Sequence, residues 1–347
     1  MKKKCTLKDL SKILNLAVST VSKALNNSSE ISNSTKTKVQ NIALLYNYTP
    51  NKSAQNLKSK RTKTIGIIVP DLLSHFFAMA IHGIETEANS KGYKIIICLS
   101  NDSKEKESES IKTLINGSVD GLIISLSKEA QITGDYGHFE EALKYDFPVV
   151  LFDRTFEPMI CDKISINDQL AAKEATEHLL KTGCRNIIFL STISGTSVGE
   201  KRKMGYVDGL INSGLQSNIL NIENYKSFEN LLLKQLQKIK VDGIVAADEL
   251  SAITTIKIAL KNSYKIPEDI SVIGFTNGVL AENYVPSLTV VDQQAKEQGT
   301  LAASTLIKRL DKKIPSEPKH LILKTSLIQR QSTLPLLELK SIDMTNF

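Results

Sequence analysis

The sequence lacks paired cysteines, an export signal, long hydrophobic runs and catalytic motifs, and each absence excludes a class of protein. Its four cysteines are far apart, with no CxxC pair and no histidine at metal-ligand spacing. Isolated cysteines are typical of reduced thiols in the cytoplasm, so we expect neither disulfides nor a metal site. The longest apolar runs, such as IGIIV and IIICL, are strand-sized, so we expect no membrane span.

The start of the chain also lacks the unbroken apolar core of a signal peptide. Lys8, Asp9, Ser11 and Lys12 interrupt the apolar residues that follow the basic tip, so we expect a cytoplasmic protein. The five histidines are scattered, and no P-loop or GxGxxG pattern occurs. GTSVG at 195–199 lacks the lysine and the spacing that phosphate binding needs. We therefore expect no catalytic residue, no cofactor and no enzymatic activity.

Charge is distributed unevenly along the 347 residues, whose formal net charge is +7. Residues 1–63 carry 13 Lys and Arg residues against Asp9 and Glu30, which gives +11. The rest carries 31 basic and 35 acidic residues, which gives −4. Basicity confined to one short segment indicates that this segment alone binds a polyanion.

Three short helical patterns fill the first 46 residues. Thr6 and Asp9 have the spacing of a capping box at the start of the first helix. A tight turn at Asn15 leads to the second helix, and Ser32 or Ser34 caps the third. Two helices joined by about four residues, with a third that closes a small core, predict a helix-turn-helix domain.

The second helix lies within LNLAVSTVSKALNN, residues 14–27, and has one apolar face and one face of short polar groups. A recognition helix needs this division, because its polar half reaches base edges while the other face packs on the domain. We predict that bases of double-stranded DNA are contacted by Val18, Ser19 and Lys23. Phosphate contacts or caps are expected from Thr6, Thr20, Ser22 and Asn26. The alternative is a polar surface helix without a DNA partner, which the local charge disfavours.

After residue 63, apolar strands alternate with amphipathic helices. The strands are TIGIIV, KIIICL, DGLIIS, PVVLF, NIIFL, DGIVAA and SVIGF, and we interpret all of them as buried. The amphipathic segments lie at 76–91, 104–116, 137–146, 168–182, 199–213, 226–239, 250–261 and 294–310. Such alternation indicates parallel sheets covered on both faces, and it predicts two doubly wound α/β lobes. The lysine-rich stretch between the parts, 50–63, reads as a solvated linker that is disordered alone.

The stretches TLKDLSKILNLAVSTVSKALNN and ISNSTKTKVQNIALLYNYTPNKSAQNLKSK resemble the DNA-binding headpiece and hinge of the LacI/GalR family of bacterial transcription regulators. The resemblance continues through TIGIIVPDLLSHFFAMAIHGIE, PVVLFDR, KRKMGYVDGL, SVIGF and PSLTVVDQ, and covers nearly the whole chain. It implies a repressor that binds a near-palindromic operator as a homodimer, or as a tetramer, and responds to a small-molecule effector.

The family organisation implies a small all-α helix-turn-helix domain and a two-lobed α/β sensor that resembles periplasmic binding proteins. The implied domains are the helix-turn-helix domain at 1–49, the hinge at 50–63 and the sensor at 64–340. Within the sensor, the N-lobe is expected at about 64–161 and 293–321, and the C-lobe at about 162–292 and 322–340.

The resemblance also assigns a role to the linker. In the family, the stretch matching 51–60 folds into a hinge helix on the operator, and the leucine matching Leu57 enters the minor groove. An apolar wedge of this kind costs unstacking energy and gains a DNA bend with more protein contact. Candidate hinge contacts are Asn51, Ala54, Leu57 and Lys58. Alternatively, Leu57 packs between the paired hinges.

For the effector, a sugar or nucleobase in many members, the resemblance implies contacts from Phe76, Asp153 and Arg202. Arginine can hold vicinal hydroxyls or a carboxylate with two hydrogen bonds. Alternatively, Asp153 and Arg202 form a structural ion pair beside the cleft. Asp248 and Thr276 also fall on effector positions.

The sensor departs from the family in three places. Thr276 replaces a frequent sugar-binding acid, Ala247 replaces the frequent Asn before Asp248, and Ala295 replaces an aromatic residue. These changes favour an effector that is less rich in hydroxyls, or more anionic, than a neutral hexose. In the headpiece, Ala17 stands where Ser or Thr usually caps the recognition helix, which costs about 1 kcal/mol.

Two alternative functions share the sensor fold. A solute-binding protein for uptake would need an export signal and would have no use for the basic headpiece. A regulator controlled by a protein partner that docks on the sensor would need no small-molecule effector.

Overall fold

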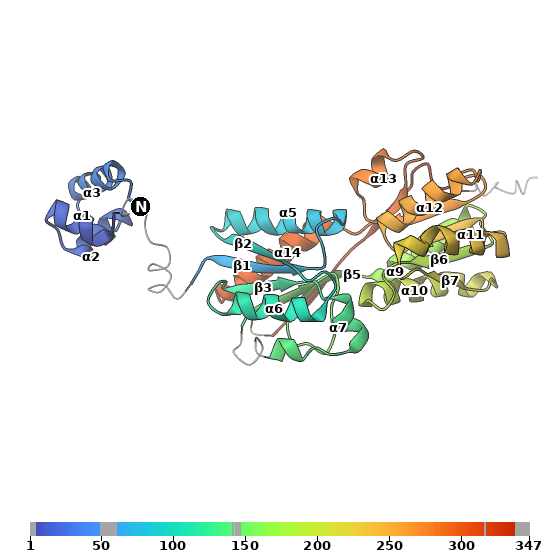
Figure 1. Ribbon diagram of the computed structural model, residues 1–347, viewed down its shortest axis with the longest axis horizontal. Coiled ribbons are helices and arrows are strands. Elements are labelled where there is room, and N and C mark those ends of the chain that lie inside the picture. The colour runs from blue at the N-terminus through green and yellow to red at the C-terminus, as the bar shows by residue number, and fades with distance from the viewer. Residues whose placement is uncertain (1–4, 49–60, 141, 143–146, 316, 337–347) are drawn as a thin grey trace, which may run out of the picture. The chain divides into compact units, whose positions relative to one another are not determined.

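The computed structural model describes residues 5–48, 61–140, 142, 147–315 and 317–336. The chain divides between Thr62 and Lys63 into two compact units. We call the first unit the headpiece and the second the sensor (Figure 1). The predicted hinge contacts Asn51, Ala54, Leu57 and Lys58 lie outside the described residues.

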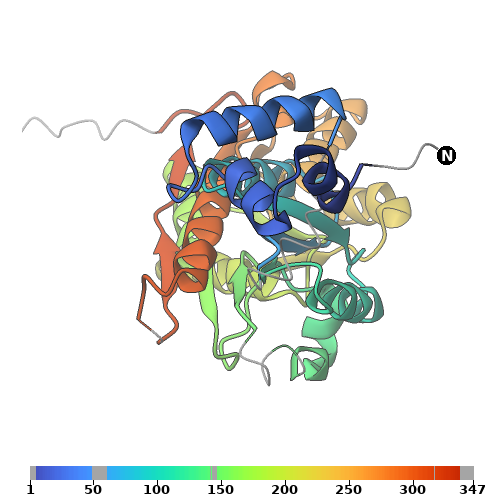
Figure 2. The ribbon, with the colours of Figure 1, turned by 90° about the vertical axis from the view of Figure 1, so that its left-hand side faces the viewer.

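Three helices form the headpiece, namely α1 (Leu7–Leu14), α2 (Val18–Leu25) and α3 (Asn33–Leu45). Each helix contributes fully buried side chains to one small core, for example Leu10, Val21 and Val39. Of the three headpiece helices α3 is the longest (Figure 2), and all three contact one another. The predicted helix-turn-helix arrangement is therefore present.

The beginnings of these helices follow from local signals. Thr6 and Asp9 form the predicted capping box, in which the Asp9 amide donates to Thr6 Oγ1 and the Thr6 amide donates to Asp9 Oδ2. Asn15 adopts the left-handed conformation, with φ 54°, and so turns the chain into α2. Ala17 precedes α2 without a side-chain cap bond, whereas the hydroxyl of Ser32 caps α3.

The first lobe of the sensor contains a six-stranded sheet of order β11-β5-β4-β3-β1-β2, in which all strand pairs are parallel. Its strands are β1 (Thr64–Val69), β2 (Lys94–Leu99), β3 (Gly121–Ile124), β4 (Val149–Phe152), β5 (Asp162–Ile166) and β11 (His320–Leu323). Its helices are α5 (His75–Ser90), α6 (Lys104–Ile115), α7 (Lys128–Thr133), the 3₁₀ turn η1 (Gly137–Phe139) and α14 (Ala295–Leu310).

Both faces of this sheet are buried. Successive side chains of β1 point to opposite faces, so Ile67 packs with α5 and α14 while Ile68 packs with α6. Strands that are covered on both faces have continuous apolar sequences, so these strands could be predicted from the sequence. In contrast to its interpretation as a buried strand, β2 is an edge strand whose Ile96, Ile97 and Leu99 are exposed.

The second lobe repeats this plan with a sheet of order β12-β10-β9-β8-β6-β7, in which only the β10–β12 pair is antiparallel. Its strands are β6 (Ile187–Ser191), β7 (Asn218–Asn221), β8 (Gly243–Ala246), β9 (Ser271–Phe275), β10 (Thr289–Asp292) and β12 (Ser326–Ile328). Its helices are α9 (Asp168–Lys181), α10 (Ser197–Leu210), α11 (Phe228–Lys238), α12 (Glu249–Lys261) and α13 (Val279–Asn283), with 3₁₀ turns η2 (Ile211–Ser213) and η3 (Tyr225–Ser227).

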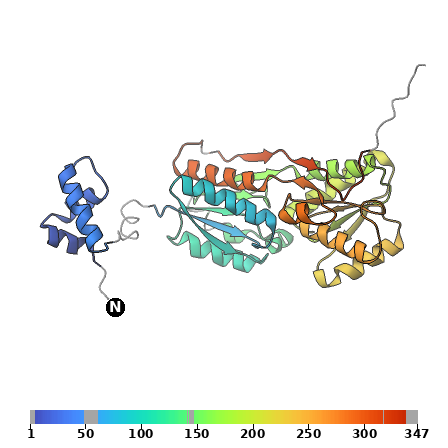
Figure 3. The same cartoon turned by 90° about the horizontal axis from the view of Figure 1, so that it is seen from above.

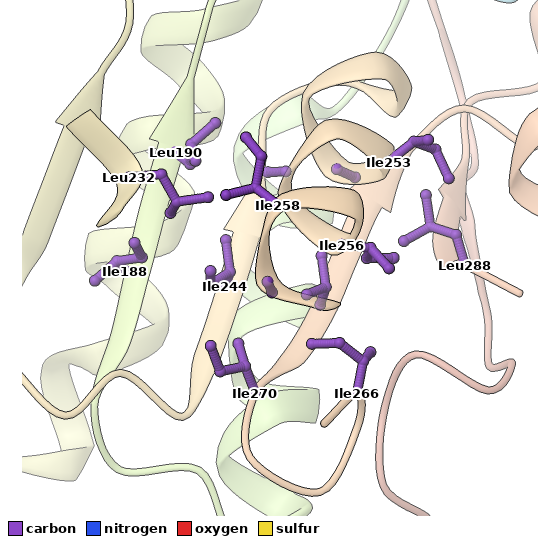
Figure 4. Close-up of a cluster of buried hydrophobic side chains, with 14 of the residues drawn as sticks. Ile188, Leu190, Leu232, Ile244, Ile253, Ile256, Ile258, Ile266, Ile270 and Leu288 are labelled. Atoms are coloured by element: carbon purple, nitrogen blue, oxygen red, sulfur yellow. The ribbon is translucent and has the colours of Figure 1, made fainter. Parts of the chain in front are cut away.

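Helices α9 and α10 pack on one face of the second sheet, and α11 and α12 pack on the other. On the latter face, Ile244 of β8 and Ile256 of α12 belong to one buried cluster with Ile270 (Figure 4). Two doubly wound parallel α/β lobes, as the sequence predicts, therefore make up the sensor. None of the helices in the described part of the chain is long and apolar enough to cross a membrane.

The chain passes between the lobes three times (Figure 3). The first crossing follows β5 at Asn167, the second lies at Gln293 and Gln294 between β10 and α14, and the third lies at Lys324 and Thr325 between β11 and β12. Residues next to these crossings can therefore link the two lobes.

The crossings correct the predicted lobe boundaries. The N-lobe was expected to end at 161, yet β5 at 162–166 pairs with β4 and with β11 in the first sheet. The boundary at 321/322 also falls inside β11, which pairs with β5 along its whole length. β5 begins with two charged residues, Asp162 and Lys163, so its sequence does not read as a buried strand. Both are nevertheless buried, and Arg309 pairs with Asp162.

Candidate functional site

The predicted DNA-reading face of α2 is exposed. Val18 is 39% exposed although it is apolar, and Ser19, Lys23 and Asn26 are exposed too. On the opposite side of α2, Val21 is buried in the headpiece core. The helix thus has the division that base readout in a major groove requires.

Several polar groups around this face are already bonded. Lys23 Nζ forms an ion pair with Glu30 in the turn before α3. The Asn26 side chain donates to the Ser22 carbonyl at 3.0 Å, and the Thr6 hydroxyl donates to Asp9 Oδ2 at 2.7 Å. Thr20 and Ser22 are half-buried. Asn26 and Thr6 therefore hold helix ends in the headpiece itself, which fits a positioning role at phosphates.

In the sensor, Arg202 of α10 is buried and lies at the centre of a hydrogen-bond network. Its Nε donates to Asp168 Oδ1 at 2.8 Å, one terminal nitrogen donates to the Ala247 carbonyl at 2.6 Å, and the other donates to Gln293 Oε1 at 2.7 Å. The guanidinium also lies 4.0 Å from the ring centroid of Phe275. Asp168 and Gln293 stand directly at two of the three crossings, so Arg202 joins these crossings within the second lobe.

This network includes a second predicted effector residue. Thr276, with φ 84°, follows β9 and accepts a hydrogen bond from Gln293 Nε2 through its hydroxyl. The Gln298 side chain in turn donates to the Gln293 carbonyl at 2.8 Å. Gln293 therefore connects Thr276 to Arg202, and it was not among the predicted effector residues.

Asp153 follows β4 in the first lobe, is buried and has φ 58°. Burial, followed by the charge of Asp168, raises the pKa of the Asp153 carboxyl to about 7, while Arg154 and Arg202 oppose this shift. The alternative of an Asp153–Arg202 ion pair is wrong in this structure, because the partner of Arg202 is Asp168. Burial also raises the pKa of Asp168, and the guanidinium of Arg202 opposes that rise.

Asp248 occupies the amino-terminal cap of α12. It accepts hydrogen bonds from the Ser251 amide at 2.8 Å and from the Thr192 hydroxyl at 2.6 Å. Tyr225, in η3, lies close enough to Asp248 for the two side chains to interact electrostatically. Burial raises the pKa of the Tyr225 phenol most, and the charge of Asp248 raises it further. Its ring is half-exposed and stacks on Phe228 with centroids 5.6 Å apart.

Tyr225 was not among the predicted effector residues, although its position in the sequence offered a signal. The residue follows closely on β7, and the carboxyl ends of parallel strands are where ligands of doubly wound sheets bind. The side chain of Phe76 is buried in the core of the first lobe and packs edge-on against Phe77. A ligand contact by Phe76 remains a prediction.

The two lobes touch each other along one side of the cleft. The amide of Ser197, the first residue of α10, donates to Gln131 Oε1 of α7 at 2.7 Å. Lys128 Nζ donates to the Thr192 carbonyl at 3.4 Å. These contacts join α7 of the first lobe to the β6–α10 loop of the second lobe.

The GTSVG segment of this loop also has the spacing of a GxSxG pattern, in which serine stands at a sharp turn between a strand and a helix. Here five residues separate β6 from Ser197, and Thr196 caps α10. Among the described residues, no histidine forms a hydrogen bond with Ser197. The segment is therefore the start of a helix rather than a nucleophile.

Each lobe of the sensor exposes a group of apolar side chains, and we call the two groups together the exposed apolar surface. In the first lobe it comprises Ile96, Ile97 and Leu99 of the edge strand β2. In the second lobe it comprises Leu250 of α12 together with Val279, Leu280 and Val285 on and after α13, and Val285 is 81% exposed. Exposed apolar side chains that are grouped on neighbouring elements are typical of a protein interface.

Comparison with protein families matches both units. Residues 6–51 match the model of bacterial regulatory proteins of the lacI family. Residues 176–333 match the model of a periplasmic binding protein-like domain.

Relatives match the chain over nearly its whole length. The HTH-type transcriptional regulator RegA of Clostridium saccharobutylicum is 30% identical over 95% of this chain and 99% of its own. The sucrose operon repressor of Streptococcus mutans is 32% identical over 94% of this chain and 98% of its own. Among solved structures, the lac repressor dimer bound to operator and an anti-inducer superposes with a TM-score of 0.84 at 22% identity, covering 96% of this chain and 100% of the repressor chain. At this identity the structural likeness shows the fold.

Proposed function

Since the chain belongs to the LacI family of bacterial regulatory proteins, we propose that it is a repressor whose homodimer binds a near-palindromic operator and responds to a small molecule. The family consists of DNA-binding transcription regulators, so the chain is a regulator and not an enzyme. A solute-binding protein is not favoured, because the regulators match the headpiece and the sensor together. Because a bacterial transcription regulator binds DNA, we propose that the protein is located in the cytoplasm.

The observation that carries this proposal is the exposed face of α2 on a basic, independently packed headpiece. Val18 meets a thymine methyl, Ser19 donates or accepts at a base edge, and Lys23 donates to guanine acceptors. Phosphates are contacted by Thr20, Ser22, Asn26 and the α1 cap at Thr6, which set the register of the headpiece on the duplex. In the hinge, Leu57 enters the minor groove, flanked by Asn51, Ala54 and Lys58.

The effector binds between the lobes, where side chains of both converge. Asp153 and Arg202 are its polar partners, Thr276 and Asp248 line the second lobe, and Tyr225 offers a half-exposed ring for stacking. Carbohydrates are the first class to test, because one relative is a sucrose operon repressor. An effector more anionic than a neutral hexose stays the alternative, because Arg154 and Arg202 lie near Asp153 and the raised pKa of Asp153 reduces the negative charge of its carboxyl.

The homodimer forms through the exposed apolar surface of β2, α12 and α13. Placing this surface against its own copy removes exposed isoleucine, leucine and valine side chains from water. The two headpieces of a dimer then read two half-sites related by the same two-fold axis, which is why a near-palindromic operator is expected.

The test selects DNA from a random-sequence pool with the full chain and, in parallel, with residues 63–347. We expect the full chain to enrich a near-palindrome, with affinity that falls steeply with salt by about 0.9 in log–log slope per phosphate contact. The shorter protein should enrich nothing. Enrichment of the same sequence by residues 63–347 would remove DNA recognition from the headpiece.

A further inference from the structure

The ion pair between Lys23 and Glu30 places an acid beside the cation that is to read the DNA. Lys23 lies on the exposed face of α2, and Glu30 lies in the turn that leads to α3. Both side chains remain accessible, with exposed fractions of 48% for Lys23 and 65% for Glu30. The pair therefore sits on the surface that approaches DNA and is not a buried structural contact.

The charge of the headpiece makes this placement unusual. Residues 1–63 contain 13 basic residues and two acids, Asp9 and Glu30. Asp9 stabilises the start of α1, because its carboxylate accepts from the amide and the hydroxyl of Thr6 at 2.9 and 2.7 Å in the capping box. Among the described residues, the Glu30 carboxylate accepts from Lys23 and not from a helix end, and an acid near the duplex repels phosphates. Its position on Lys23 calls for a function.

We propose that Glu30 is a positioning residue that holds the Lys23 ammonium for donation to a base and away from the phosphates. The inference rests on the proposed role of the headpiece in reading DNA. Lysine is a point charge on a flexible four-carbon stem with three rotatable donors, so by itself it contacts any nearby acceptor. A carboxylate on one side of the ammonium restricts the stem and leaves fewer orientations for the remaining donors.

The same carboxylate lowers binding to DNA of the wrong sequence. Phosphate contacts supply essentially all of non-specific affinity, and a lysine that is free to swing contributes one such contact. When Glu30 holds Lys23, the ammonium makes no phosphate contact. It contributes to DNA binding only where a guanine acceptor lies within its reach. The ion pair thus lowers the total affinity for DNA and increases the discrimination between base pairs.

A double-mutant cycle on the full chain tests this proposal. The wild type first selects its site from random DNA, and Lys23→Ala identifies the base pair whose preference depends on Lys23. Affinities of the wild type, Lys23→Ala, Glu30→Gln and the double variant are then measured on three duplexes. These are the selected site, the site with that base pair exchanged, and random DNA. Glu30→Gln keeps the size of the side chain, and thermal melting of each variant checks the fold.

We expect Glu30→Gln to bind random DNA several-fold more tightly and to lose about tenfold of the preference at the Lys23-dependent base pair. Glu30→Asp, which retains the charge on a shorter stem, should recover part of the preference. In the Lys23→Ala background, Glu30→Gln should leave the preference at that base pair unchanged.

Two results overturn the inference. The first is an unchanged base preference in Glu30→Gln. The second is an equal effect of Glu30→Gln with and without Lys23, which would mean that Glu30 acts by phosphate repulsion alone. A wild-type chain that selects no sequence would instead overturn the proposed function, and the two failures are thus distinguishable.

Discussion

Arg202 and Asp168 form a buried ion pair in which Arg202 Nε and Asp168 Oδ1 are 2.8 Å apart. Asp168 follows the first crossing between the lobes, and the same guanidinium also binds Gln293 at the second crossing. A residue at the family's effector position therefore also holds two of the segments about which the lobes would move. Any ligand that competes for Arg202 acts on the crossings directly, which gives effector binding a route to the arrangement of the lobes.

We expect Arg202→Met to destabilise the sensor by about 3–5 kcal/mol, because it leaves the Asp168 carboxylate buried and unpaired. Adding Asp168→Asn to Arg202→Met removes the stranded charge and should recover a substantial part of this loss. Urea unfolding of residues 63–347 measures both values. Equal stability of Arg202→Met and the wild type would show that the pair does not brace the crossings.

The raised pKa of Asp153 predicts a stability that depends on pH. The unfolded carboxyl ionises near 3.8, whereas the folded one holds its proton up to about pH 7. Between these values the folded state binds more protons than the unfolded state, so the contribution of this group to stability falls as pH rises and is level above pH 7. Asp153→Asn cannot ionise and so does not lose stability in this way. Its free energy of unfolding relative to that of the wild type should therefore rise by about 2–3 kcal/mol between pH 5 and 7.

Thermal melting across pH 4 to 8 checks this expectation. Glu85→Gln, which removes a carboxylate from the exposed side of α5, is the matched control and should follow the wild-type profile. A constant difference between Asp153→Asn and the wild type at all pH values would mean that the Asp153 carboxyl is ionised throughout.

The missing cap of α2 allows a stabilising change. Ala17 occupies the cap position with extended backbone, φ −61° and ψ 145°, but makes no side-chain bond. Ala17→Ser supplies a hydroxyl for an unpaired amide of the first turn and should stabilise the headpiece by about 1 kcal/mol. The headpiece transition in circular dichroism measures the gain, with Ala17→Val as the control that adds bulk without a cap. A fall in the melting temperature of Ala17→Ser would mean that the cap position is sterically closed.

Features with a local cause could be predicted from the sequence. The capping box of Thr6 and Asp9, the turn at Asn15 and the apolar strands of both sheets follow from residue type and spacing alone. Features with a tertiary cause could not. The charged start of β5 is buried where Arg309, from a helix far along the chain, pairs with Asp162. The apolar run of β2 has no signal that distinguishes an edge strand from a central one.

The candidate site shows the same division. Asp153, Arg202, Asp248 and Thr276 were identified through family positions, whereas their partners depend on which strand ends lie together. Asp168 and Gln293 bind Arg202 from 34 and 91 residues away in sequence. No periodic pattern indicates such contacts, so the network and its role at the crossings became visible only in the folded chain.

The final prediction concerns the apolar surface of α13. Leu280 of α13 and Met204 of α10 are matched in exposure, at 49% and 51%, but lie on different helices of the second lobe. If the dimer forms through α13, Leu280→Asp places an unpaired carboxylate in an apolar interface and should raise the dimer dissociation constant by about 100-fold or more. Met204→Asp should leave the dimer intact.

Sedimentation velocity of the two variants over a concentration series measures the dissociation constants. Operator affinity should fall in parallel for Leu280→Asp, because separate chains lose the high effective concentration of the second headpiece. Melting temperatures close to wild type would confirm that both variants fold, as expected for exposed positions. A dimeric Leu280→Asp beside a monomeric Met204→Asp would move the interface from α13 to the face of α10, and with it the axis that relates the two half-sites.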